Sequence, residues 1–219
     1  MLEKHLEKLR PMVMELFEKD SSGHDASHLE RTMTAALYLQ EREGGDRTVI
    51  GIAALLHDVH RIMEHDAGRF VSPEESIAPI REMLAGTDLT EDQIDQICYC
   101  VEHHERYNWN GDNVEDWNTL VLQDADNLDA LGALGIARAF AYGGAHGIPL
   151  YDPSVPLGGR DDYAESDKPS ASMLHFLFDK SFRLVENMNT ETGRELAQRK
   201  IVYMRDFAER FLNEWGARF

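Results

Sequence analysis

The sequence has little cysteine and little positive charge, and each shortage excludes a class of protein. Its two cysteines, Cys98 and Cys100, are spaced so that a helix would point them to different faces. A disulfide framework is therefore excluded, and a reducing compartment is expected. The sequence has 22 Lys and Arg against 40 Asp and Glu, a formal net charge of −18. Because such a surface repels a phosphate backbone, we expect no stable binding to nucleic acid.

Long apolar runs are missing as well. The sequence has no stretch of about 18 or more apolar residues. Its charged, amphipathic N-terminus has no apolar core of the kind found in signal peptides. We therefore expect a cytoplasmic protein that does not associate with membranes. The 219 residues, 42% of them hydrophobic, are enough to bury a full core.

Apolar residues recur at helical spacing almost throughout, and no convincing strand pattern is found. Helix starts are indicated by capping patterns at Ser27 with Glu30, at Asp46, at Ser72-Pro73 and at Thr90 with Gln93. One helix is predicted from about Ser27 to Glu43. A second, buried on most sides, ends near His57-Asp58, and a third delivers His103 and His104 at its end. The fold class predicted is all-α.

The segment Gly143–Ser170 differs from the rest because it is rich in glycine and proline. Segments longer than about 12–15 residues without secondary structure tend to be lids or binding loops. We interpret 143–170 as a flap on a single domain spanning 1–219. The core of that domain would cover about 20–142, and C-terminal helices in 171–219 would pack on it. A linker between two domains stays open as the alternative.

The common nucleotide and hydrolase motifs GxxxxGK[ST], GxGxxG, GxSxG and HExxH are absent, and paired histidine and aspartate stand out instead. Three such doublets occur, at His24-Asp25, His57-Asp58 and His65-Asp66. Only His57-Asp58 directly follows an apolar run, Ala53–Leu56. A carboxylate is costly to bury unless a charge or a metal compensates it, so this doublet favours a divalent cation nearby.

Two more residues extend the doublet into a candidate site. His28 lies on the preceding helix, and Asp126 lies on the helix after His103-His104. Two imidazoles and two carboxylates from three helices would form a mixed nitrogen and oxygen site with open positions. Such a site suits Mn, Fe, Ni or Mg better than a closed structural zinc. Asp124 and Asp129 compete with Asp126 on spacing alone.

In the order H…HD…D, His28, His57-Asp58 and Asp126 resemble the HD superfamily of metal-dependent phosphohydrolases. A bacterial branch of small HD hydrolases is similar over nearly the whole chain, at His24–Arg31, Ala54–Asp58, Asp124–Phe140, His175-Phe176, Lys180, Met188, Thr190, Gly193-Arg194 and Arg199. The resemblance implies an HD-domain helical bundle with a central divalent metal ion, whether Mn, Fe, Ni, Mg or Zn. It implies His28, His57, Asp58 and Asp126 as ligands, since Asp126 follows alanine as in the family's Ala-Asp pattern.

The resemblance also implies roles around the ion. Asp58 would steer a water as the catalytic group, and Asp25, Asp124 and Asp129 would orient the ligands. His103-His104-Glu105 is similar to the HHE segment of two-metal relatives. We assign both histidines to the site, as ligands of a second ion or as phosphate contacts, and favour His104 for the phosphate. His60 is expected near the site without an assigned role.

Four cations are candidates for holding a substrate phosphate, namely Arg31, Arg61, Arg138 and Lys180. Arg31 follows His28 by three residues and Arg61 follows Asp58 by three, so each would share a helix face with a ligand. Asn127 stands where this branch favours arginine, which removes one charge near the site.

The function predicted is metal-assisted hydrolysis of a nucleotide or another small phosphoester, with the flap closing over the substrate. Two alternatives stay open. One is a non-catalytic sensor that binds a nucleotide in the same pocket. The other is an HD-fold di-iron oxygenase, which the paired His103-His104 would permit. A homodimer built on an exposed helix face is a further possibility.

Overall fold

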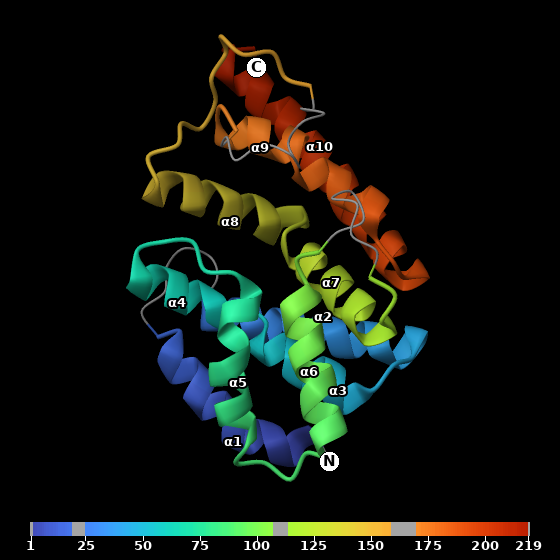
Figure 1. Cartoon of the computed structure of the whole chain (residues 1–219). Coiled ribbons are helices and arrows are strands. Elements are labelled where there is room, and N and C mark those ends of the chain that lie inside the picture. Colours follow the sequence, from blue (N-terminus) through green and yellow to red (C-terminus); the bar gives the residue numbers. More distant parts are fainter. Residues whose placement is uncertain (1, 19–24, 107–113, 159–169, 219) are drawn as a thin grey trace. The chain divides into compact units, whose positions relative to one another are not determined.

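The structure is a computed structural model that describes residues 2–18, 25–106, 114–158 and 170–218. Helices form its regular structure, and no strand occurs in these ranges, which confirms the all-α class. The chain divides into two compact units, Met1–Asp126 and Asn127–Phe219 (Figure 1). The prediction of one domain with its C-terminal helices packed on the core stays a prediction. None of the described helices combines the length and the apolar character that crossing a bilayer requires.

The first unit is built around one buried helix. Its elements are α1 (Leu2–Leu16), α2 (Ala26–Glu43), α3 (Arg47–Leu56), α4 (Val59–Ala67), η1 (Pro73–Ser76), α5 (Ile77–Leu84), α6 (Glu91–His103) and α7 (Trp117–Asp129), whose last residues belong to the second unit. Every residue of α3 from Val49 to Leu56 is buried, and α3 packs against α1, α2 and α6 (Figure 1). The near-continuous apolar run thus forms the centre of this core, as predicted.

Three of the four predicted helix caps are confirmed, and one is wrong by two residues. Ser72 caps η1 and forms a capping box with Glu75. Asp46 caps α3 by accepting from the backbone N–H groups of Thr48 and Val49, and Thr90 forms a capping box with α6. The cap of α2 is Asp25 rather than Ser27. Asp25 has the extended backbone that a cap needs, and its carboxylate accepts from the His28 N–H at 2.8 Å. Ser27 already lies within the first turn.

The His57-Asp58 doublet lies between two helices. Helix α3 ends at Leu56 and α4 begins at Val59, which confirms the predicted helix end. Adjacent residues within a helix diverge by about 100°. Because Asp58 leaves the helical backbone, with φ −96° and ψ 11°, its side chain can turn toward the same point as that of His57.

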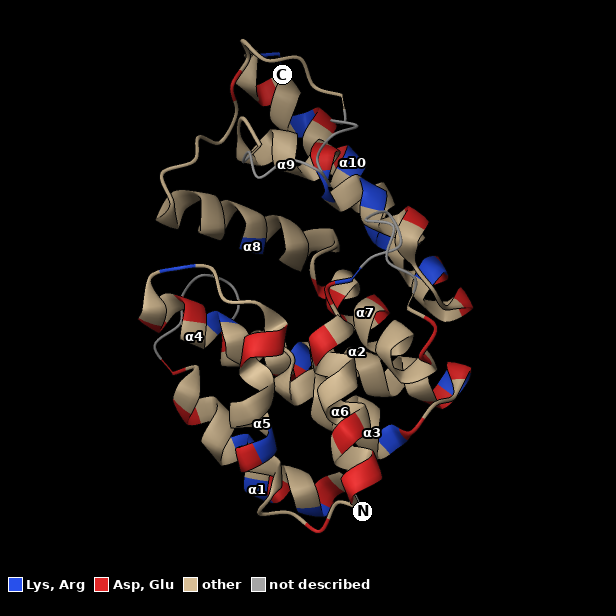
Figure 2. Cartoon of the chain, viewed as in Figure 1, with Lys and Arg blue, Asp and Glu red and all other residues tan. Residues whose placement is uncertain are grey.

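The second unit contains α8 (Gly132–Ala145), α9 (Met173–Asp179), η4 (Ser181–Asn187) and α10 (Glu191–Trp215). Helix α8 packs against α9 and α10, where the Phe140 ring contacts the rings of Phe207 and Phe211. Arg138 is the single charged residue of α8 (Figure 2). Helix α7 ends at Asp129, and Gly132 opens α8 with φ +76°.

The predicted flap is partly described. Its first residues complete α8, and 159–169 lie outside the described residues. The segment 148–158 is irregular and is bonded to α9. The carbonyls of Pro149 and Leu150 accept from the N–H groups of Met173 and Leu174, at 2.9 and 3.0 Å. This segment is therefore anchored within its own unit, and its closure over a substrate stays a prediction.

Candidate metal centre

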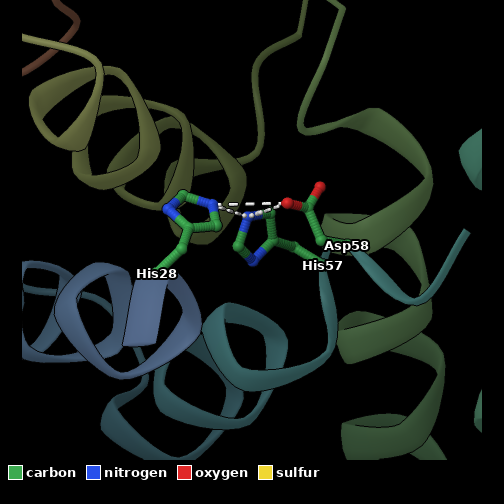
Figure 3. A group of neighbouring side chains, drawn as sticks. All are labelled: His28, His57 and Asp58. Carbon is green, nitrogen blue, oxygen red and sulfur yellow. Dashed lines mark hydrogen bonds and ion pairs between the residues drawn. The ribbon is translucent and has the colours of Figure 1, made fainter. Parts of the chain in front are cut away.

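Four side chains of the first unit converge on one point, with His28 from α2, His57 and Asp58 from the α3–α4 junction, and Asp126 from α7. Figure 3 shows the His28 and His57 rings and the Asp58 carboxylate pointing toward one another. The Nε2 atom of His28 lies 3.2 Å from Nε2 of His57, 3.3 Å from Asp58 Oδ2 and 3.5 Å from Asp126 Oδ1. The Nε2 atom of His57 lies 3.6 and 3.8 Å from the same two oxygens. The structure thus brings together the four residues predicted as ligands.

Contacts on the outer side of each ring aim the two imidazoles. The Nδ1 atom of His57 lies 2.8 Å from the Ala54 carbonyl oxygen. A carbonyl only accepts, so Nδ1 carries the hydrogen and Nε2 presents its lone pair to the centre. His28 lies in the first turn of α2, which Asp25 caps, and its Nδ1 is 3.4 Å from the Thr32 hydroxyl.

The charge states suit metal binding. Burial lowers the pKa of His57 to about 4, against the attraction of Asp58 and Asp126. Burial acts to raise the pKa of Asp126, but attraction by His57 and His28 outweighs it, so that pKa lies below its ordinary value. At neutral pH the centre therefore holds a neutral imidazole and an ionised carboxylate, which are the forms that coordinate metals.

The donor set fits a divalent cation. The side chains of His28 and His57 are fully buried and that of Asp58 is 3% exposed, whereas that of Asp126 retains 20% exposure. The carboxyl groups of Asp58 and Asp126 lie beside the neutral imidazole of His57 and favour a cation, and a divalent ion supplies the compensating charge. Two nitrogen and two oxygen donors form a mixed set of the kind that binds divalent metals. Of the four side chains, that of Asp126 is therefore the most exposed.

A second pair of histidines lies directly beside this centre. The ring of His104, which follows α6, is 5.1 Å from that of His57 and 5.7 Å from that of His60. The rings of His60 and His104 are buried, and neither Nε2 atom has a hydrogen-bond partner among the residues that the structure describes. Burial, followed by the charge of Arg61, lowers the pKa of His60 to about 4.

His103, predicted for the site together with His104, points elsewhere. Its Nδ1 lies 2.9 Å from the Tyr99 carbonyl, and its ring stacks on that of Tyr99 at 4.0 Å. It belongs to none of the candidate metal-binding groups among the described residues, whereas His60 and His104 do. His60 was expected near the site without an assigned role. Its position three residues after His57 is the only feature of the sequence that points to it.

Of the four predicted phosphate-binding cations, Arg61 contacts a candidate ligand. Its Nε lies 3.8 Å from Asp58 Oδ1, while its guanidinium contacts Glu105 and donates to Glu64 at 3.2 Å. Arg31 lies partly exposed, one turn after His28 on α2. Its contact with a substrate stays a prediction.

Arg138 and Lys180 belong to the second unit. Arg138 forms an ion pair with Asp129 at 2.7 Å, and both side chains are largely buried. Lys180 is the C-cap of α9, and its Nζ lies 5.9 Å from the centre of the Phe176 ring. Three carboxylates are predicted to orient ligands. Asp25 caps the first turn of α2, which carries His28, Asp124 is fully buried on α7, and Asp129 pairs with Arg138. Their effect on the ligands stays a prediction.

The chain is similar to known proteins in both sequence and fold. The HD domain family matches residues 25–131. YpgQ of Bacillus subtilis (strain 168) is 32% identical over 207 residues, which cover 93% of this chain and 90% of YpgQ. The crystal structure of an HD-superfamily hydrolase from Bacillus thuringiensis is 34% identical with a TM-score of 0.76, covering 99% of this chain and 100% of that one. The crystal structure of B. subtilis YpgQ in complex with ADP is 30% identical with a TM-score of 0.72, covering 95% and 96%.

Proposed function

The chain belongs to the HD domain family, and we propose that it is a metal-dependent phosphohydrolase acting on a nucleotide or another small phosphoester. The observation that carries the proposal is the convergence of two imidazoles and two carboxylates, with donor atoms 3.2–3.8 Å apart, at a partly open centre. The HD-superfamily hydrolase among its relatives supports hydrolysis. The ADP in the YpgQ structure supports a nucleotide as the substrate class.

His28, His57, Asp58 and Asp126 would hold the ion. A divalent cation in such a site supplies Lewis-acid polarisation of a phosphoryl oxygen and lowers the pKa of a bound water toward neutrality. The Ala54 carbonyl keeps the hydrogen of His57 on Nδ1, so that Nε2 remains a ligand. The second oxygen of Asp58, which lies toward Arg61, can accept a hydrogen bond from the attacking water and fix its direction.

The excess of negative charge on this chain makes local positive charge necessary for an anionic substrate. Arg61 lies beside Asp58, and Arg31 lies one turn after His28. The chain has 40 acidic residues, and their negative field opposes the binding of an anion. Together with the ion, the two arginines would offset that field at the metal centre. The exposed edge of Asp126 marks the side from which the phosphate would enter.

The test is phosphate release from a panel of nucleotides and small phosphoesters. Chelator-stripped protein receives Mn²⁺, beside Asp126→Ala and a control, His65→Ala, whose imidazole is 81% exposed. We expect metal-dependent release by the wild type and the control, and none by Asp126→Ala with unchanged helix content. ADP binding without release from any compound would contradict hydrolysis and indicate a nucleotide sensor. Iron-dependent oxygen consumption would indicate an oxygenase.

A further inference from the structure

Helix α10 leaves one long face exposed, and we propose that this face pairs in the antiparallel orientation with α10 of a second copy of the chain. The helix runs from Glu191 to Trp215, a length of about 37 Å. Its buried residues recur every three or four positions and so lie on one side: Gly193, Ala197, Ile201, Met204 and Ala208. On the opposite side lies an apolar pair, Val202 and Tyr203, whose side chains are 71% and 50% exposed.

Four charged residues surround this apolar pair in a fixed order. Glu195 and Arg199 precede the pair, and Asp206 and Arg210 follow it. Arg199 lies 3.8 Å from Glu195, and Arg210 lies 2.9 Å from Asp206, each one turn apart. All four side chains are more than half exposed. Exposed ion pairs of this kind contribute little to the stability of a single chain, so their charges are available to a partner.

The order of these groups makes the face complementary to itself. A two-fold axis through the midpoint of the apolar pair brings residues equally far before and after that midpoint opposite each other. Arg199 then faces Asp206 of the second copy, and Glu195 faces Arg210 of the second copy. The two apolar pairs meet at the axis. Each of the four charges therefore meets an opposite charge, around an apolar centre of the kind found in protein interfaces.

The same order selects the antiparallel orientation. A parallel pairing would place each charged residue opposite its own copy, so that like charges repel. Arg199, Val202 and Asp206 are three and four residues apart, which is the spacing of the side chains along the seam between two paired helices. The face is therefore suited to a helix that runs in the opposite direction.

The charge of α10 also differs from that of the whole chain. The chain has a formal net charge of −18, whereas α10 contains five acidic and five basic residues. Figure 2 shows residues of both signs along α10. Because two strongly acidic chains repel each other, a second copy approaches most readily through a surface with no net charge. This balance favours α10 as the surface through which two copies meet.

The test measures self-association of the full-length chain by sedimentation velocity at a series of concentrations. We expect the wild type to form a dimer. Arg199→Glu and Asp206→Arg should each raise the dissociation constant of the dimer at least about tenfold, because each variant places like charges opposite each other. An equal mixture of the two variants should dimerise again, since opposite charges then meet at both places. The matched control is Arg47→Glu, which breaks an exposed ion pair with Glu41 outside α10 and should dimerise like the wild type.

The mixture distinguishes this surface from any other face of the chain. A wild type that stays monomeric throughout the series overturns the proposal, and so does a dimer that both charge variants retain or a mixture that stays monomeric. Tyr203→Ser keeps every charge and should also weaken the dimer. It decides the matter should circular dichroism show that a charge variant does not fold, and dimerisation at the wild-type level would then contradict the proposal. Phosphate release plays no part in the test, so the outcome is independent of the proposed function.

Discussion

The Nδ1 atom of His57 lies 2.8 Å from the carbonyl oxygen of Ala54, three residues earlier on the most buried helix of the first unit. This hydrogen bond fixes which nitrogen carries the hydrogen, and it turns Nε2 toward His28, Asp58 and Asp126. Because Ala54 belongs to the core, the packing that stabilises α3 also orients a ligand. Stability and metal binding should therefore be linked, and this linkage underlies the predictions that follow.

Metal should stabilise the protein through the four-residue centre. Free Mn²⁺ at about 100 times its dissociation constant should add about 2.7 kcal/mol to the free energy of unfolding, a rise of several degrees in Tm. Asp126→Ala should lose this rise, because it removes the carboxylate on α7. Thermal melts followed by circular dichroism, with Mn²⁺ or with EDTA, measure the difference. An equal rise in Asp126→Ala and wild type would place the ion elsewhere.

The metal-free protein should lose stability as the pH falls from about 6.5 to 4. Burial lowers the pKa of both His57 and His60 to about 4, while in the unfolded chain each titrates near 6.5. Between these values the unfolded state binds more protons, so the free energy of unfolding drops by up to about 1.4 kcal/mol per pH unit for each histidine.

Urea titrations in EDTA at pH 7.5, 6 and 5 measure this slope. His60→Gln should have a shallower slope than the wild type, whereas His65→Gln, at an exposed site, should match it. The lowered pKa of Asp126 adds its own loss only below its ordinary value near 3.8, outside this window. A flat profile between pH 7.5 and 5 would show that the two imidazoles are already charged in the folded protein.

The cap of α2 should matter both for stability and for the metal. Asp25 accepts from the His28 N–H at 2.8 Å, so Asp25→Ala should cost about 1 kcal/mol of stability. It should also weaken Mn²⁺ binding, because the turn that carries His28 loosens. Asp25→Ser keeps a capping oxygen and should restore most of both losses. If alanine and serine behave alike in melts and in Mn²⁺ titrations, the cap does not position His28.

Arg138 offers a contrast between a structural and a substrate-binding role. Its ion pair with Asp129 is largely buried, so Arg138→Gln should lower stability by about 1–3 kcal/mol while Mn²⁺ binding is unchanged. Urea unfolding and the Mn²⁺ titration give both readouts. A rise in KM with unchanged stability would instead support the predicted contact with the substrate.

The start of a helix could be predicted where the sequence offers a single capping residue. Asp46 and Thr90 each precede an apolar helix without a rival cap nearby, and both are caps. At α2 the sequence offers Asp25 and Ser27 within three residues. The choice between them depends on which backbone is extended, and the residue types do not determine that.

The four candidate ligands could be predicted, because they lie on separate helices and follow the family pattern. Which of two adjacent histidines faces the site could not be predicted, because that depends on how the end of the helix is rotated. The side chains of His28, His57, Asp58 and Asp126 converge as the H…HD…D order implies. Adjacent residues such as His103 and His104 point about 100° apart, so only one can face the cluster, and the packing of α6 selects His104. The pairing of His60 with His104 arises from tertiary packing alone.

The most direct test of the central claim is one Mn²⁺ titration in which bound metal and the rate of phosphate release are measured on the same samples, for wild type and Asp126→Ala. The account predicts that the wild-type rate rises from zero as Mn²⁺ binds and saturates with it, while Asp126→Ala shows no release at the same metal concentrations. A rate that is already full in chelator-stripped protein, or is the same in Asp126→Ala, would contradict the claim that these four residues form the catalytic metal centre.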